Sequence, residues 1–285
     1  MIFLFVLALL PRIEIAAAND SSVTYRELVP LRVMLDPATH LFHYAGCPDI
    51  LSGMESVSPG AATLRGYKEH TCVALRKDEY ATHVEKRPPR DAALISVLFL
   101  GNSLTYFNDM PRMTARIGAQ EPRPLFIDAV TLGGADLDDL WYRTDALKRI
   151  WQLHWDYVII QERGGHAAMD RGERFHEGLR RLSDQVRMSG ATPVLFMTWY
   201  PGNETFFRNA ARRAHTLLLP VGSAWKKELD ADGTHPNIAG SYLIACTVYS
   251  FVYDKPASDT LVLSEGQAAA IQKAAWDAVR RAKNP

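Results

Sequence analysis

Short apolar runs, each bounded by glycine or polar residues, recur through the last two thirds of the chain. They lie at 97–100 (VLFL), 156–161 (DYVIIQ), 192–200 (TPVLFMTWY) and 216–225 (TLLLPVGSAW), the last expected to be a strand running into a helix. Their aliphatic and β-branched composition predicts strands that are buried on both faces, as in a parallel sheet. Polar stretches of helical length separate them, for example 172–190. This alternation predicts right-handed β-α-β units and a three-layer α/β/α sandwich around a parallel sheet.

The last helix is signalled at both its start and its buried face. Ser264 and Gln267 have the spacing of a capping box. Four apolar positions then recur on one helical face: Ala268, Ile271, Ala275 and Val279. We expect a helix here with a purely structural role.

The chain divides at 85–93 (EKRPPRDAA), where two prolines and clustered charge indicate a linker. We therefore expect a small N-terminal module and linker over 19–90 and the α/β domain over 91–285. Residues 2–10 (IFLFVLALL) are too short to span a bilayer, and Ala16 and Ala18 suit a cleavage site. This predicts a signal peptide over 1–18 and a secreted or periplasmic protein. An N-terminal buried strand or a misplaced start are the alternatives.

Composition narrows the classes of partner. The 32 basic and 32 acidic residues balance, with no long run of either sign, so there is no electrostatic footprint for nucleic acid or an anionic membrane. No second apolar stretch is long enough to span a bilayer, which predicts a soluble mature protein without stable membrane insertion. The sequence leaves the oligomeric state open.

Ser103 lies just past the predicted strand that ends near Gly101. Ligands of open α/β sheets bind outside the carboxyl ends of the strands, so its hydroxyl is well placed for chemistry. It is not needed as a helix cap, because Asn108 or Asp109 is expected to cap the helix that Pro111 opens. Ser103 is therefore a candidate functional residue.

A second candidate group lies far along the chain, where Asp232 and His235 flank Gly233 and Pro236 is expected to open the next helix. In a turn of this length the carboxylate can reach Nδ1 of the imidazole, which leaves Nε2 facing outward as a base. A serine beside such a histidine is the arrangement that acyl transfer requires, because the base removes the hydroxyl proton and later delivers it to the leaving group.

These two motifs, FLGNSLT (99–105) and DGTHP (232–236), resemble the first and last blocks of the SGNH (GDSL-like) hydrolase superfamily. The resemblance covers roughly residues 92–283. It implies a flavodoxin-like α/β sheet and a serine esterase without a cofactor. Ser103 is implied as nucleophile, His235 as base and Asp232 as its orienting partner. Gly101 is expected to let the strand turn sharply.

The middle blocks of the superfamily supply the oxyanion hole, and here the match is looser. VTLGGADL (130–137) resembles the glycine block, which implies the amides of Gly134 and Ser103 as donors, although a simple tight turn is the alternative. The third block normally carries an asparagine, which VIIQERGGH (158–166) lacks. Gln161 is the closest chemical substitute, with a brace at the strand end as its other possible role. His166 is a further candidate, or a surface-loop residue.

Residues 39–72 resemble the small metal-binding module at the start of Ada-type DNA-repair proteins. His43, Cys47 and Cys72 match three ligand positions, but Leu75 stands at the fourth; His40 or His70 would have to complete a zinc site. In an exported chain a Cys47–Cys72 disulfide is the simpler expectation, with zinc or free thiols as alternatives. Cys246 is expected to be buried. We predict no metal, and DNA repair does not fit the charge balance.

The resemblance implies hydrolysis of a small-molecule or carbohydrate ester. By analogy with exported members of the superfamily, the first choice is a short acyl group such as acetyl on a carbohydrate. Two alternatives stay open: an acyltransferase that uses a sugar hydroxyl as acceptor, and a non-catalytic binding protein. Aromatic residues follow predicted strand or turn ends and are expected in the core or along a substrate cleft: Trp141, Tyr142, Trp199 and Tyr200.

Overall fold

The computed structural model describes residues 33–44, 51–57, 62, 65–70, 90–164, 167–200, 202–259, 261 and 263–283. Several expectations lie outside these residues: the signal peptide over 1–18, Cys47, Cys72, Leu75, His166 and most of the linker.

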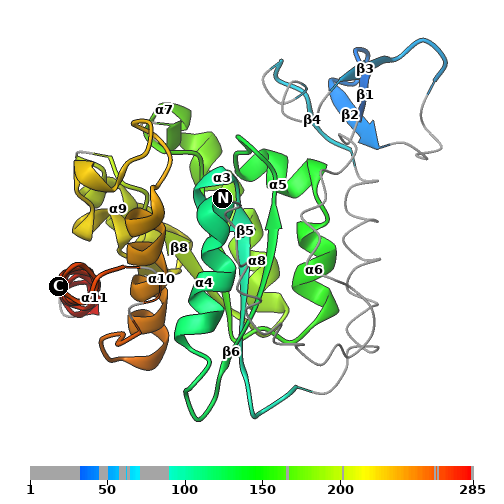
Figure 1. The fold of residues 1–285 in the computed structure, drawn as a ribbon. Coiled ribbons are helices and arrows are strands. Elements are labelled where there is room, and N and C mark those ends of the chain that lie inside the picture. The colour runs from blue at the N-terminus through cyan, green and yellow to red at the C-terminus, as the bar shows by residue number, and fades with distance from the viewer. Residues whose placement is uncertain are drawn as a thin grey trace, which may run out of the picture.

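A five-stranded sheet forms the centre of the main domain (Figure 1). Its strands are β5 (Ile95–Gly101), β6 (Leu125–Thr131), β7 (Tyr157–Ile160), β8 (Thr192–Phe196) and β9 (Leu217–Leu219). The order is β6-β5-β7-β8-β9 and every neighbouring pair is parallel. The α/β fold with a parallel sheet is thus confirmed.

Helices cover both faces of this sheet because successive strand residues point to opposite sides. Leu98 and Leu100 of β5 pack in one apolar cluster with α5 (Leu137–Arg143), α6 (Ala146–Gln152), α8 (Glu173–Met188) and α9 (Asn203–Ala214). Val97 and Phe99 pack in another with α4 (Met110–Ile117), α10 (Ile238–Tyr253) and α11 (Glu265–Lys283). This is the predicted three-layer arrangement.

Short helices connect these elements at the sheet edge. They are α3 (Ser103–Tyr106), α7 (Ala167–Arg171) and the 3-10 helices η2 (Phe107–Asp109), η3 (Val221–Ala224) and η4 (Lys227–Leu229). Within the part of the chain that the structure describes, no helix combines the length and the apolar character needed to cross a membrane.

Three local expectations about helix starts are wrong. Asp109 occupies the N-cap position of α4, but no capping bond forms from its side chain. Pro236 does not open a helix: α10 begins at Ile238, because the Asn237 side chain accepts the Gly240 N–H at 3.0 Å and caps it. The helix expected after β9 is only the four-residue η3.

The C-terminal helix and the buried cysteine are confirmed. Within α11, Ala268, Ala275 and Val279 are fully buried, and Ile271 packs against the same core from a partly buried position. Cys246 is buried on α10 with a free thiol.

The N-terminal residues form a separate four-stranded sheet of β1 (Val33–Asp36), β2 (Leu41–Tyr44), β3 (Glu55–Val57) and β4 (Lys68–Glu69). Its order is β3-β1-β2-β4. It contacts the main domain through Phe42, whose ring meets Tyr142 of α5 edge-on at 5.7 Å between centroids. Tyr142 and Trp141 are both buried in that core, so neither lines a cleft.

Candidate active site

Ser103 lies at the carboxyl end of β5, the strand with β6 on one side and β7 on the other. The chain passes from β5 to β6 on one side and then crosses from β6 to β7 on the other side of β5. This reversal makes the carboxyl end of β5 the topological switch point of the sheet, where ligands of such folds bind. Ser103 is the first residue of α3, and the Asn102 side chain caps that helix by accepting the Leu104 N–H at 3.0 Å. The serine is therefore held by local structure at the usual ligand-binding edge.

Gly101 is required for close packing rather than for a sharp turn. It lies within β5, and its backbone does not adopt a left-handed conformation. A Cβ atom at this position would lie 2.3 Å from Thr105 Oγ1 and 2.5 Å from Gln161 Oε1. The expected reason for this glycine is wrong, and the space below Ser103 explains it instead.

Asp232 and His235 share a tight turn between η4 and α10, in which Gly233 adopts a φ of 85°. Oδ1 of Asp232 accepts the backbone N–H groups of Thr234 at 3.0 Å and His235 at 2.8 Å, while Oδ2 lies 2.9 Å from His235 Nδ1. The backbone and side-chain hydrogen bonds from His235 lower the pKa of Asp232 to about 2. The side chain is 55% exposed, so both solvent and these hydrogen bonds favour the charged carboxylate at neutral pH.

The turn brings His235 to Ser103 across 132 residues of sequence. His235 Nε2 lies 3.0 Å from Ser103 Oγ. With Nδ1–H directed at Asp232, Nε2 carries the lone pair and accepts the serine proton. The ring of Phe107 stacks on the imidazole, with centroids 4.2 Å apart and planes 14° from parallel. Ser103, His235 and Asp232 thus form a continuous chain of hydrogen bonds.

Gly134 lies in the exposed turn after β6, with a φ of 66°. Two backbone-directed contacts keep this turn beside the serine. The Leu132 N–H donates to the Gly101 carbonyl at 3.1 Å, and Asn102 Nδ2 donates to the Ala135 carbonyl at 2.7 Å. The turn therefore lies against the loop that carries Ser103, and the role of Gly134 as an oxyanion donor stays a prediction.

Gln161 is fully buried at the end of β7. Its Oε1 accepts the Asn102 N–H at 2.9 Å and the Thr105 hydroxyl at 2.8 Å, and its Nε2 donates to the Glu162 carbonyl. These contacts correspond to the bracing role that was the alternative for this residue. The role of Gln161 as an oxyanion donor stays a prediction.

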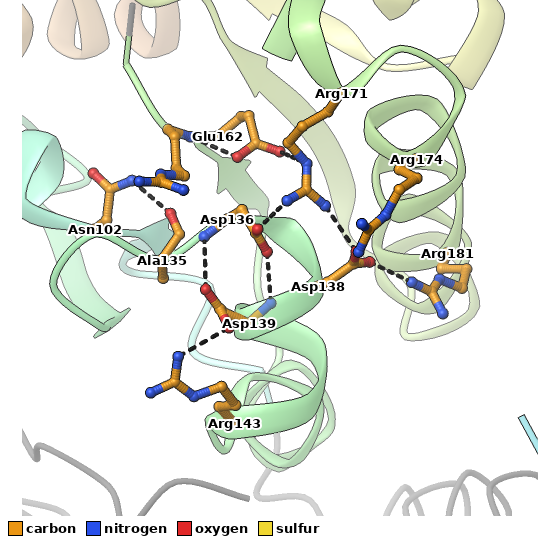
Figure 2. A network of polar contacts seen from close by, with 11 residues as sticks. Asn102, Ala135, Asp136, Asp138, Asp139, Arg143, Glu162, Arg171, Arg174 and Arg181 are labelled. Carbon is orange, nitrogen blue, oxygen red and sulfur yellow. Dashed lines mark hydrogen bonds and ion pairs between the residues drawn. The ribbon is translucent and has the colours of Figure 1, made fainter. Parts of the chain in front are cut away.

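Sequence reasoning missed the polar network behind this site. Figure 2 shows Arg171 among the carboxylates of Asp136, Asp138 and Glu162. Burial raises the pKa of Glu162 to about 7. The one sequence signal was Asp136 followed three residues later by Asp139, which form a capping box at the start of α5.

The structure brings together two of the histidines that the zinc alternative would use. The rings of His43 and His70 lie 4.1 Å apart between centroids, and His40 stacks instead on Tyr67. Within the described ranges, no group of three or more histidine, cysteine or acidic side chains is arranged to hold a metal ion. The choice among disulfide, zinc and free thiols concerns cysteines outside those ranges.

The solved structures that are similar to this chain include TesA, YxiM and BT4096. TesA is 19% identical with a TM-score of 0.46, over 54% of this chain and 96% of its own. The Bacillus subtilis protein YxiM is 13% identical with a TM-score of 0.38, over 66% of this chain and 56% of its own. BT4096, a gut microbial diltiazem-metabolizing enzyme, is 14% identical with a TM-score of 0.34, over 59% and 47%. The likeness concerns the fold alone. No protein-family model and no curated protein matches the chain.

Proposed function

We propose that this protein is a serine esterase that hydrolyses a carboxylic ester through an acyl intermediate on Ser103. The observation that carries the proposal is the hydrogen-bonded series from Ser103 Oγ to His235 Nε2 (3.0 Å) and from His235 Nδ1 to Asp232 Oδ2 (2.9 Å). It lies at the sheet edge where α/β folds bind their ligands.

The reaction follows from the protonation states of these groups. His235 takes the Ser103 proton as Oγ bonds to the ester carbonyl carbon, and the resulting imidazolium is stabilised by the charged Asp232. His235 then returns the proton to the departing alkoxide, which leaves as an alcohol. In the second half, His235 deprotonates a water that attacks the acyl carbon, and Ser103 recovers its proton as the acid is released.

The oxyanion is proposed to be held by the backbone amides of Ser103 and Gly134 and by the Gln161 side chain. Losing one oxyanion donor typically lowers turnover by about 10²- to 10³-fold. The glutamine that stands at position 161 in place of the usual asparagine therefore affects the efficiency of the reaction rather than its class.

The proposed substrate is a small-molecule or carbohydrate ester, with a short acyl group such as acetyl on a carbohydrate as first choice. This rests on the resemblance of the two terminal motifs to exported SGNH hydrolases, which is an analogy at the level of fold. Export is proposed on the same basis together with the apolar segment at 2–10 and the small residues Ala16 and Ala18.

The test compares wild type with Ser103→Ala on a short-chain chromogenic ester and on a serine-directed phosphonate followed by mass spectrometry. Ser96→Ala, at the opposite end of β5, is the matched control. We expect wild type and the control to turn over and to be labelled on Ser103. Ser103→Ala should lose at least about 10³-fold in kcat and all labelling.

Two outcomes would redirect the proposal. If adding a sugar acceptor converts the product from free acid to acylated sugar, the chain is an acyltransferase that uses the same three residues. Should the wild type neither turn over nor label, the esterase proposal is wrong and a binding protein with this fold replaces it.

A further inference from the structure

Two contacts of Asn102 tie together the ends of three strands behind the proposed site. Its Nδ2 donates to the carbonyl of Ala135 at 2.7 Å, which joins the end of β5 to the turn after β6. Its backbone N–H donates to Gln161 Oε1 at 2.9 Å, which joins the end of β5 to the end of β7. The turn after β6 and the end of β7 are therefore each linked to the residue before Ser103.

Arg171, the last residue of α7, forms a second link between the turn after β6 and the end of β7 (Figure 2). Its guanidinium pairs with Asp136, which follows Ala135, and its Nε lies 3.6 Å from Oε2 of Glu162, which follows Gln161. A further nitrogen of the same guanidinium lies 2.7 Å from Asp138 Oδ2. One side chain thus bridges the strand ends on the far side from Asn102.

The contact between Arg171 and Glu162 is important because Glu162 is an acidic side chain buried in the protein. Glu162 is completely buried, and Oε1 accepts the Arg163 N–H at 2.7 Å while Oε2 faces Arg171. A buried carboxylate beside a second acid requires a partner of opposite charge to stay ionised. Without Arg171, no side chain would join Asp136 to Glu162, and the turn between β6 and α5 would lose this link to the end of β7.

The contacts of Asn102 and Arg171 bear on the proposed site because the predicted oxyanion amides belong to residues next to Asn102 and Ala135. Ser103 directly follows Asn102, and Gly134 directly precedes Ala135. A Cβ atom built on Gly134 would meet no atom within 4 Å, so nothing packs against the glycine on that side. The contacts of the neighbouring Ala135 and Asp136 therefore bear on the position of the Gly134 amide.

We propose that Arg171 is a positioning residue: by holding Asp136 and Glu162 together, it sets the distance of the Gly134 amide from Ser103. This inference rests on the proposed esterase function. It assigns a role to a residue whose side chain pairs with Asp136, Asp138 and Glu162 rather than with Ser103, His235 or Asp232, and that no sequence motif marks.

The test uses Arg171→Gln with Arg174→Gln as matched control. Arg174 pairs with the same Asp138, at 3.1 Å, but belongs to neither strand end. Because a displacement of about 1 Å can lower a rate about 100-fold, we expect Arg171→Gln to reduce kcat by roughly 10- to 100-fold, with KM within about threefold of wild type. Amide hydrogen exchange over 131–137 should accelerate in this variant only. Arg174→Gln should stay within about twofold of wild type in kcat.

A merely structural role would lower the melting temperature in both variants without a selective effect on kcat or on exchange over 131–137, and that result would overturn the inference. If Arg171→Gln does not fold, Arg171→Lys, which keeps the positive charge, replaces it in the same experiment. Its kcat is expected to lie between those of wild type and Arg171→Gln.

Failure of the proposed function gives a different result. If the wild type neither hydrolyses the ester nor reacts with the phosphonate, the esterase proposal fails, and hydrogen exchange still decides the positioning of the turn. Faster exchange over 131–137 confined to Arg171 variants supports the anchor, and unchanged exchange refutes it.

Discussion

Asp232 orients His235 from an exposed turn, where hydrogen bonds lower its pKa. Three donors converge on its carboxylate, two of them backbone N–H groups. They hold its pKa near 2, below the ordinary value of 3.8, so the contribution of this carboxylate to stability is present above about pH 3.8 and is lost as the pH falls through about 2.

We expect Asp232→Asn to lower kcat by roughly 10²- to 10⁴-fold, because an amide can hold the imidazole in the wrong tautomer and cannot stabilise the imidazolium. Kinetics on the chromogenic ester measure this. Asp254→Asn, which removes an exposed ion pair to Lys283 at the far end of α10, is the control and should leave kcat unchanged. Equal kcat values for Asp232→Asn and wild type would show that the carboxylate has no orienting role.

Gly101 provides a prediction about packing. We expect Gly101→Ala to destabilise the fold by about 1–3 kcal/mol, because its Cβ atom would collide with Thr105 and Gln161. Gly266→Ala, in α11 with open space around it, should instead stabilise by about 0.5–1 kcal/mol through helix propensity. Urea unfolding of the two variants compares these effects. A Gly101→Ala variant as stable as wild type would contradict the close packing below Ser103.

At the scale of elements, η2 connects the serine helix to the start of α10. Asn108 Nδ2 donates to the Pro236 carbonyl and to Ser241 Oγ, both at 2.9 Å, and its backbone adopts a φ of 53°. Left-handed backbone is unfavourable for most residues, although asparagine tolerates it. This turn therefore holds the residue after His235 against the segment that follows Ser103.

We expect Asn108→Ala and Asn108→Gly to lose kcat to a similar degree, about tenfold, because both remove the amide that holds Pro236. Their stabilities should differ, with the glycine variant more stable by about 1 kcal/mol because it adopts positive φ without strain. Thermal unfolding and ester kinetics separate the two effects. Full activity of Asn108→Gly would show that the hydrogen bonds do not position His235.

The network between β7 and α7 predicts a pH-dependent stability. Burial raises the folded pKa of Glu162 from 4.5 to about 7, so its stabilising contribution is fully present below about pH 4.5 and is lost as the pH rises through about 7. Relative to Glu162→Gln, wild type should lose on the order of 2–3 kcal/mol between about pH 5 and about pH 8. Urea unfolding across this range measures the difference, and parallel pH curves would contradict it.

At the scale of the whole molecule, the N-terminal sheet shares a core with the α/β domain. Leu35 and Phe42 belong to the same buried cluster as Tyr142 and Leu140 of α5. Arg181 of α8 donates to the Tyr142 hydroxyl at 2.6 Å and pairs with Asp138 at 2.7 Å. Packing of the small sheet is therefore continuous with the network that surrounds Arg171.

We expect Phe42→Ala to destabilise the main unfolding transition by about 3 kcal/mol, because Phe42 is only 1% exposed and its loss leaves a cavity against α5. Leu51→Ala, where the leucine is 68% exposed, should change stability by less than about 0.5 kcal/mol. Thermal unfolding followed by circular dichroism tests this. A main transition unmoved by Phe42→Ala would mean that the two sheets unfold independently.

Local signals predicted four of the five strands of the main sheet and missed the edge strand β6. β5, β7 and β8 are apolar runs because they are covered on both faces, so composition alone identified them. The edge strand β6 escaped this criterion because it carries the polar Asp128, which pairs with Arg149 of α6. The start of α10 was expected at Pro236 rather than after the Asn237 cap, because a proline and a capping side chain give competing signals at adjacent positions.

Residues close together in the chain were enough to predict the alternating α/β pattern, the position of Ser103 after a buried strand and the turn that pairs Asp232 with His235. Three other features became visible only in the folded protein: His235 Nε2 lies 3.0 Å from Ser103 Oγ, Gln161 braces Asn102 and Thr105, and Arg171 faces two strand ends. Ser103 and His235 are 132 residues apart in the chain. Gln161 is 59 residues from Asn102 and 56 from Thr105, and Arg171 is 35 residues from Asp136. Chain spacing carries no information about such contacts, because they exist only once the parallel strands have aligned their carboxyl ends at one edge of the sheet.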